Sequence, residues 1–355
     1  MRANTPLMRK VVIHAPGGYG QLKIERHPTP TPSPGEVLVS TRAIGVNFAD
    51  CIVRMGLYKS ARDYVGWPIT PGFDFAGIVS GLGDGVRGFA LGDEVFGVTR
   101  FGAYATDVAV PSNQLLQRPS ALTQLEAGAF PTIHVTAWYA LHRLGRVRPG
   151  NDVLIHSAAG GVGGALVQLA KRAGARVVGV VGAGHKVSTA HAHGADVVID
   201  RSTQDLWAAA REAAPNGYHL VLDANGVETL RDSYRHLAPR GRLVVYGFHT
   251  MFRRGGSGFP NPLRLAWSWL RTPRFNPLQL TSDNRSVMGF NLSFLFAETE
   301  MLHEAMTDLV SGLEDGSLQS PPIQTFSLSD VASAHRSLES GTTVGKLVLI
   351  PTELS

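Results

Sequence analysis

Residues 151–201 constrain the fold more than any other part of the chain. The apolar run 152–156, bounded by turn-forming and small residues, is typical of a short buried strand. A glycine-rich run, residues 158–164, follows, and a helical spacing of apolar positions then continues to Gly174. A second apolar run spans residues 175–181. The order strand, glycine-rich turn, helix and strand predicts a parallel α/β unit.

The glycine-rich turn is the place where a dinucleotide pyrophosphate would bind. A helix N-terminus offers unpaired N–H groups and the positive end of the helix dipole. Glycine also lets the backbone approach the phosphates, although the usual first glycine is Ala158 here. Glycine turns alone are weak evidence, but the flanking strands and helix supply the required context. We therefore expect a pyrophosphate site rather than a tight turn with only a packing role. Its residues are Ala158, Gly160, Gly161, Val162 and Gly163.

The end of the second strand indicates which dinucleotide to expect. NAD sites place an acidic residue roughly 20 residues after the glycine turn, where it holds the ribose 2′-hydroxyl. This chain has Gly182 there, and the next acidic residue is Asp196. Lys186 and Arg201 could clamp a 2′-phosphate, or they could be solvated surface cations. The sequence favours NADP(H).

Length and composition limit the class of protein. A chain of 355 residues favours two domains, and no run of 18 apolar residues predicts a membrane span. The N-terminus lacks the apolar core of a signal peptide. A single cysteine, Cys51, excludes an internal disulfide and a cysteine-rich zinc site. We expect a cytoplasmic protein.

Positive charge is concentrated in residues 250–285. This segment contains six arginines and one acidic residue, Asp283, so it carries the whole net charge of +5. Neither a basic helix nor a zinc-finger spacing accompanies the patch, so we expect no nucleic-acid partner.

The remaining patterns divide the chain into a β-rich part and an alternating part. Residues 8–26 predict a β-hairpin, and short strands with Gly/Pro turns continue to about Pro119. From about Leu122, helices alternate with buried strands, and a helix over residues 298–313 leads back to the β-rich part. The expected strands of the alternating part are 153–156, 175–181, 196–199, 219–222, 242–246 and 287–296.

Residues 45–58 and 68–77, together with the glycine turn, resemble the medium-chain dehydrogenase/reductase superfamily in its zinc-free quinone oxidoreductase branch. The resemblance covers nearly the whole chain. Residues 289–292 and the 250–285 segment are most similar to homologues of the synaptic vesicle membrane protein of that family. The resemblance implies an α/β protein with a GroES-like β-barrel domain and a Rossmann doubly wound parallel sheet domain. The implied limits are 1–121 and 297–355 for the first domain, and 122–296, with 250–285 as an Arg/Trp-rich insertion, for the second.

The resemblance also implies the absence of a metal site. Zinc-using relatives place Cys in the segment that matches residues 46–50, and His-Glu where this chain has Phe73-Asp74. Asn47 lies in the first segment and Phe73 replaces the histidine, so a closed shell of Cys and His ligands cannot be assembled.

The implied activity is NADPH-dependent hydride transfer to a quinone or an α,β-unsaturated carbonyl compound. Such an acceptor delocalises the incoming charge itself, so the protein has to orient the reactants and stabilise an enolate. We expect Asn47 and Tyr58 as the hydrogen-bond donors; alternatively, Asn47 is a turn residue and Tyr58 a half-buried aromatic of the barrel. Asp50 is expected to be structural, paired with Arg54 if that segment is helical. Further cofactor contacts are expected at Thr136, Asn225, Tyr246, Phe290, Asn291, Leu292 and Lys346.

Two interpretations of residues 250–285 remain open. The segment could be a lid over a small-molecule acceptor, with residues 263–270 as its only helix, and this is the favoured interpretation. It could instead contact an anionic membrane or a partner, in a cofactor-binding protein with weak reductase activity. We also expect a homodimer that pairs through the edge strand 287–296, as the resemblance implies.

Overall fold

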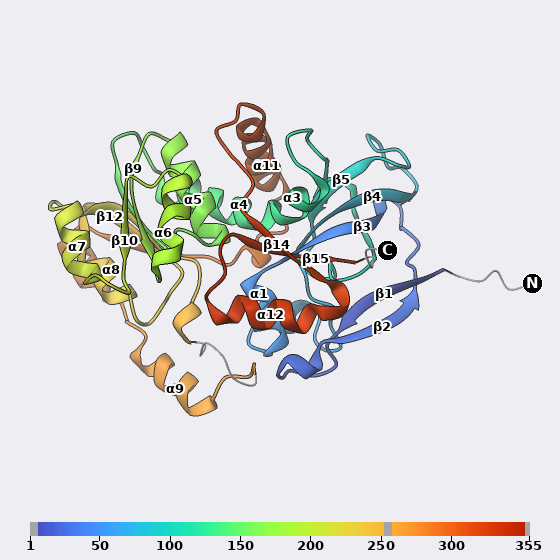
Figure 1. The fold of residues 1–355 in the computed structure, drawn as a ribbon, viewed down its shortest axis with the longest axis horizontal. Coiled ribbons are helices and arrows are strands. Elements are labelled where there is room, and N and C mark those ends of the chain that lie inside the picture. The colour runs from blue at the N-terminus through green and yellow to red at the C-terminus, as the bar shows by residue number, and fades with distance from the viewer. Residues whose placement is uncertain (1–5, 252–257, 352–355) are drawn as a thin grey trace, which may run out of the picture.

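The computed structural model describes residues 6–251 and 258–351, so part of the 250–285 insertion lies outside the described residues. Figure 1 shows two lobes side by side, with both chain ends on the same lobe. Each lobe is built around its own β-sheet, and the larger sheets have seven and six strands.

The lobe that carries the chain ends is the β-rich one. Its expected N-terminal hairpin is present, because β1 (Leu7–Val12) pairs antiparallel with β2 (Lys23–Pro28). The seven-stranded sheet has the order β14-β15-β3-β4-β5-β7, and β6 also pairs with β3. Its strands are β3 (Glu36–Val46), β4 (Asp74–Leu82), β5 (Glu94–Val98), β6 (Asp107–Pro111), β7 (Leu115–Gln117), β14 (Ile323–Ser327) and β15 (Lys346–Ile350).

The second lobe is the Rossmann domain. All of its strands are parallel, in the order β10-β9-β8-β11-β12-β13. The strands are β8 (Asp152–His156), β9 (Arg176–Val181), β10 (Val197–Asp200), β11 (Tyr218–Asp223), β12 (Leu237–Val245) and β13 (Ser286–Gly289). The expected strand 287–296 is wrong over its second half. Asn291 accepts a hydrogen bond from the backbone N–H of Ser293, and this closes a short 3₁₀ turn in place of the strand.

Twelve α-helices lie in the described residues. They are α1 (Phe48–Arg54), α2 (Lys59–Tyr64), α3 (Gln124–Ala129), α4 (Pro131–Trp138), α5 (Gly161–Arg172), α6 (Val187–Ala192), α7 (Leu206–Ala213), α8 (Leu230–Arg235), α9 (Pro262–Arg271), α10 (Pro277–Asp283), α11 (Thr299–Glu314) and α12 (Val331–Ser340).

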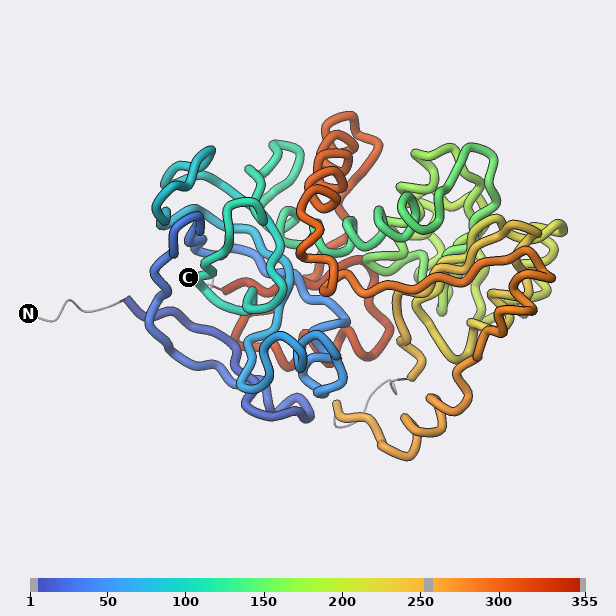
Figure 2. Tube along the Cα trace, turned by 180° about the vertical axis from the view of Figure 1, so that it is seen from behind, coloured from blue at the N-terminus to red at the C-terminus, as the bar shows by residue number. Residues whose placement is uncertain are grey.

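The insertion contains two helices rather than one. The expected helix 263–270 is α9, but α10 contradicts the expectation of a single helix. Asn276 caps α10 by accepting a hydrogen bond from the N–H of Leu278 at 3.0 Å, and Pro277 occupies its first turn. The proline therefore begins a helix here instead of breaking one. Seen from behind in Figure 2, the segment from α9 to β13 runs from the lower margin up the outer side of the Rossmann lobe.

The cores of the two lobes merge at their boundary. Helix α3 packs on β3 and β4 of the β-rich lobe, whereas α11 packs on α4. One cluster of buried apolar side chains therefore includes residues of both lobes. The domain limits at 121/122 and 296/297 stay a prediction, because the packing does not break there.

Backbone contacts join the lobes at the glycine-rich turn. Gly345 lies directly before β15, and its N–H donates to the carbonyl of Ala159 at 3.0 Å. Gly345 has φ +67°, and a Cβ there would lie 2.1 Å from the carbonyl oxygen of Pro322. Only glycine fits this position, and the approach brings β15 against the start of α5.

Asp50 ties the loops of the β-rich lobe to α1. Its buried carboxylate accepts hydrogen bonds from the N–H groups of Asn47 and Gly72 and from the Tyr104 hydroxyl. The expected pairing with Arg54 is wrong, because the Arg54 guanidinium contacts Glu339 on α12 instead. The structural role expected for Asp50 is nevertheless what these contacts indicate.

Asp50 makes stability depend on pH. Burial raises the pKa of Asp50 to about 7. In the unfolded chain its pKa is about 4. Between about pH 4 and pH 7, Asp50 is protonated in the folded state but ionised in the unfolded state. The stabilisation that Asp50 contributes is therefore complete below about pH 4 and is lost as the pH rises toward 7. Over this range the free energy of unfolding decreases by up to about 1.4 kcal/mol per pH unit. We expect the difference in unfolding free energy between wild type and Asp50→Asn to decrease over that range in urea titrations. A difference that stays constant from pH 4 to pH 7 would contradict this assignment.

Candidate functional site

A cavity of about 1620 Å³ lies between the lobes. Of the site residues expected from the sequence, all but Ala158 line it, although they come from both ends of the chain and from its middle. They are Asn47, Tyr58, Thr136, Gly160, Gly161, Val162, Gly163, Gly182, Lys186, Arg201, Asn225, Tyr246, Phe290, Asn291, Leu292 and Lys346.

Ala158 lies behind the cavity wall. Its side chain is fully buried, and a Cβ added to Gly179 on β9 would lie 2.9 Å from the Ala158 Cβ. Ala158 therefore packs the turn onto the sheet, and Ser157 and Ala159 face the cavity in its place.

The turn before α5 fits a dinucleotide pyrophosphate. A Cβ on Gly163 would lie 2.0 Å from the carbonyl oxygen of Ser157, so the helix can approach the strand only with glycine there. Ser157 itself adopts φ +58°, which turns the chain sharply. The start of α5 lines the cavity, where its N-terminal N–H groups and dipole favour an anion.

Two cations mark one end of the cavity. Arg201 follows β10, and a Cβ on Gly182 would lie 3.7 Å from its Nε. Lys186 donates from Nζ to the carbonyl of Gly341 at 2.8 Å, which holds it beside the cavity. The neighbouring Asp200 does not line the cavity, and its carboxylate accepts hydrogen bonds from the N–H and hydroxyl of Ser202. This end therefore suits a phosphate on the ribose 2′ position better than a free hydroxyl.

The opposite part of the wall holds a buried ring of Asn47, Asp74 and Lys346. Asn47 donates from Nδ2 to Asp74 Oδ1 at 2.7 Å and accepts from Lys346 Nζ. The Lys346 ammonium also lies 3.4 Å from Asp74 Oδ2, and the three residues are at most 8% exposed. Asn47 is thus positioned by an ion pair. One amide hydrogen of Asn47 and one ammonium hydrogen of Lys346 remain without an acceptor among the described residues.

Tyr58 is more constrained than Asn47. Its hydroxyl donates to Asn291 Oδ1 at 2.8 Å, and Ser293 and Ser60 extend the same hydrogen-bonded chain. Burial raises the pKa of Tyr58, so the phenol stays neutral near pH 7. The hydroxyl of Tyr58 already donates its hydrogen bond to Asn291, so Tyr58 is better suited to position a ligand than to donate a hydrogen bond to it.

Three further expected residues differ in what they offer a ligand. Thr136 directs its hydroxyl to the carbonyl of Thr132 at 2.6 Å. Phe290 packs on Tyr139 with ring centroids 4.8 Å apart. The Tyr246 hydroxyl is buried and has no hydrogen-bond partner among the described residues, and burial raises its pKa. Tyr246 is the one with an unused donor.

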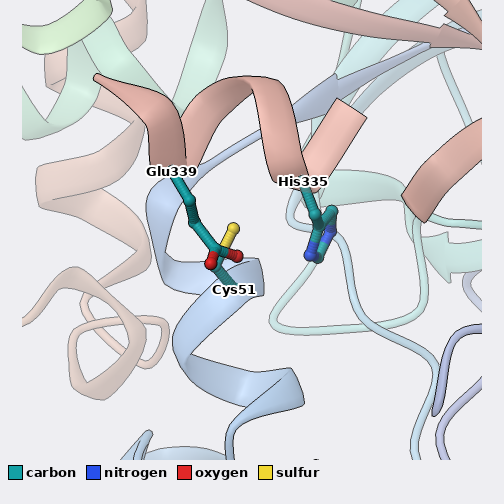
Figure 3. A group of neighbouring side chains, drawn as sticks. All are labelled: Cys51, His335 and Glu339. Carbon is teal, nitrogen blue, oxygen red and sulfur yellow. The ribbon is translucent and has the colours of Figure 1, made fainter. Parts of the chain in front are cut away.

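A buried cluster joins Cys51 on α1 with His335 and Glu339 on α12 (Figure 3), and Glu339 also lines the cavity. These groups lie close enough to hold a metal ion in principle. The fully buried Arg54 guanidinium, however, lies 2.8 Å from Glu339 and 3.1 Å from His335 Nδ1. Burial and this guanidinium hold the pKa of His335 well below its usual range. Since Arg54 already supplies the positive charge, the cluster is an internal ion pair that suits no further cation.

The sequence interpretation missed Asp74 as the anchor of Asn47 and Lys346. It also missed which side of α9 faces inward. Trp269 lines the cavity, but Trp267, only two residues away, does not.

Comparisons with known proteins agree with this architecture. The alcohol dehydrogenase GroES-like domain family matches residues 33–120, and the zinc-binding dehydrogenase family matches residues 193–349. The rat synaptic vesicle membrane protein VAT-1 homolog is 33% identical, over 98% of this chain and 85% of its own length. A 2-haloacrylate reductase from a Burkholderia species is 31% identical, over 97% of this chain and 99% of its own length.

A solved structure gives the same result. The Escherichia coli quinone oxidoreductase, determined in complex with NADPH, superposes with a TM-score of 0.84 at 29% identity, over 97% of this chain and 100% of that one. The chain therefore belongs to the medium-chain dehydrogenase/reductase superfamily of oxidoreductases, among the relatives of the VAT-1 homologues and the quinone oxidoreductases.

Proposed function

We propose that this protein is an NADPH-dependent reductase of quinones or α,β-unsaturated carbonyl compounds that works without zinc. The observation that carries the proposal is that one and the same cavity is lined by the turn before α5, by Lys186 and Arg201, and by Asn47 and Lys346. The names of two relatives support it: the Escherichia coli enzyme is a quinone oxidoreductase bound to NADPH, and the Burkholderia relative is a reductase of a haloacrylate.

Residues of the cavity would divide the work as follows. NADPH, held by the glycine turn with its 2′-phosphate at Arg201 and Lys186, supplies the hydride. For an enone, the hydride would add to the β-carbon and a proton from solvent to the α-carbon, so that the C=C bond is reduced and the cofactor would leave as NADP⁺. The unused hydrogens of Asn47 and Lys346 donate to the acceptor oxygen and stabilise the negative charge that develops on it. Asp74 keeps both donors in place, and the nearby apolar wall excludes water.

In this proposal the same ring takes the place of a metal. A zinc ion would act as a Lewis acid on the acceptor oxygen, and the Lys346 ammonium supplies positive charge there instead. Phe73 has no ligand atom to offer a metal, and its ring packs edge-on against Tyr58 with centroids 5.9 Å apart.

Two further properties belong to this proposal. We propose a homodimer, because β13 is an edge strand of the six-stranded sheet and leaves its outer backbone groups without a strand partner. A monomer mass by light scattering at micromolar concentration would contradict it. We also propose a cytoplasmic location, which rests on the single cysteine Cys51.

The outer face of α9 favours a second candidate, a protein that associates with an anionic membrane. Leu263, Trp267 and Leu270 are 82%, 61% and 61% exposed on a helix that also carries arginines. An amphipathic face of this kind can lie in a lipid interface. The VAT-1 homologues are named as vesicle membrane proteins. Within the described residues, no helix is long and apolar enough to traverse a bilayer.

The first prediction concerns activity. The purified protein should oxidise NADPH when a quinone or an enone is added, and the rate should be unchanged by a chelator such as EDTA. The decrease in absorbance at 340 nm reports the reaction directly. If no member of a broad quinone and enone panel is reduced, or if chelation abolishes the activity, the proposal is wrong in its reaction or in its metal independence.

The second prediction concerns the cofactor. NADPH should bind much more tightly than NADH, and Arg201→Ala should weaken NADPH about tenfold or more while NADH changes little, because one charge-assisted contact is lost. Fluorescence titration measures both affinities. Arg211→Ala is the control, since Arg211 is an exposed arginine of the same lobe that does not line the cavity. Equal affinities for the two cofactors in the wild type would exclude the 2′-phosphate site.

The third prediction separates a lid from a membrane surface. Trp269→Ala should raise KM for bulky acceptors severalfold and leave NADPH affinity unchanged, because Trp269 lines the cavity. Trp267→Ala should leave the kinetics unchanged, and it should weaken binding to anionic vesicles if the outer face meets lipid. Unaltered kinetics in Trp269→Ala would reject the lid, and unaltered vesicle binding in Trp267→Ala would reject the membrane surface.

A further inference from the structure

The cavity is larger than one ligand requires. Pockets for single small molecules usually occupy roughly 300–1,000 Å³, whereas this cavity has about 1620 Å³. The residues assigned to the cofactor and to hydride transfer come from both lobes but not from the insertion. The insertion supplies further wall: Thr250 and Met251 at its start, and a separate stretch between Arg264 and Phe275.

This stretch of wall is predominantly apolar, and it comes from α9 and from the residues that directly follow the helix. Leu265 and Trp269 are four residues apart, so they lie on the same helix face, and both line the cavity. Leu263, Trp267 and Leu270 do not line it. Leu265 is half-buried and Trp269 is 65% exposed, so this side of α9 offers the cavity an open apolar surface that can accommodate an extended apolar group.

Arg264 adds an unmatched positive charge to the same wall. Lys346 is paired with Asp74 and Lys59 with Asp63, whereas the Arg264 side chain forms no ion pair or hydrogen bond with any described residue. Two acidic residues line the cavity: Glu339 is paired with Arg54, and Glu228 forms an ion pair with none of the described residues, Arg264 included. The Arg264 guanidinium is thus available to bind an anion at the end of an apolar surface.

From this arrangement we infer that the acceptor is an anionic amphiphile: a conjugated carbonyl group at Asn47, an apolar body along Leu265 and Trp269, and a carboxylate at Arg264. The inference rests on the proposed reductase function and defines its substrate class. Contact with Leu265 and Trp269 gives affinity for the apolar part of the acceptor. The Arg264 guanidinium selects the carboxylate of the acceptor through paired N–H donors.

The test uses a matched pair of probes that the protein cannot reduce, dodecanoate and 1-dodecanol, with binding measured by isothermal titration calorimetry. Wild-type protein should bind dodecanoate more tightly than dodecanol. Arg264→Gln should weaken dodecanoate about threefold to tenfold and leave dodecanol unchanged, as expected for a partly exposed charge-assisted contact. Arg271→Gln is the matched control, because Arg271 is an exposed arginine of the same helix that does not line the cavity.

Two tryptophan variants show where the probes bind. Trp269→Ala should weaken both probes, and Trp267→Ala should weaken neither. Equal affinities for the two probes, equal losses in Arg264→Gln and Arg271→Gln, or a loss confined to Trp267→Ala would each overturn the inference. Because binding is measured without turnover, these outcomes are distinguishable from a failure of NADPH oxidation.

Discussion

The contact of Gly345 and Lys346 with the rest of the cleft is the constraint on which the site depends. Gly345 donates its N–H to Ala159 beside the glycine turn, and the next residue directs its ammonium to Asn47 and Asp74. Two adjacent residues therefore set the position of the phosphate-binding turn relative to the groups expected to act on the acceptor. Any side chain at position 345 would collide with Pro322, so this spacing has little freedom.

Charge compensation explains why so many ionisable groups can be buried around the cleft. Lys346 is balanced by Asp74, and Arg54 is balanced by Glu339, while Asp50 is satisfied by hydrogen bonds. Burying an unpaired charge is costly, so the two members of each ion pair hold one another in one geometry. The consequence for function is a rigid donor pair at one part of the cavity wall. Helix α9, which is weakly packed, forms another part of the cavity wall, and this part can adapt to a ligand.

Local patterns predicted the features that local physics determines. The apolar runs predicted the buried strands, and the glycine turn with its flanking strand and helix predicted where α5 begins. The cavity-lining positions of Lys186 and Arg201 followed from the order of the parallel strands. In each case the deciding residues are close in the sequence, or are related by the regular geometry of a parallel sheet.

The features that were missed depend on contacts between distant residues or on competing local signals. Arg54 pairs with Glu339, far along the chain, rather than with Asp50 four residues before it. Nothing local indicated that Asp74 would meet Lys346. In the insertion, the residues Asn276 and Pro277 are compatible with either the start of a helix or a break in one. In the structure Asn276 caps the N-terminus of α10, so a helix begins there.

We propose that the cavity holds NADPH between the Lys186–Arg201 end and the Asn47–Lys346 ring. A crystal structure of the protein with NADPH should show density for the 2′-phosphate in contact with Arg201 and Lys186, and for the nicotinamide next to Asn47 and Tyr58. A nucleotide bound with its 2′-phosphate away from both cations, or with its nicotinamide remote from Asn47, would contradict it.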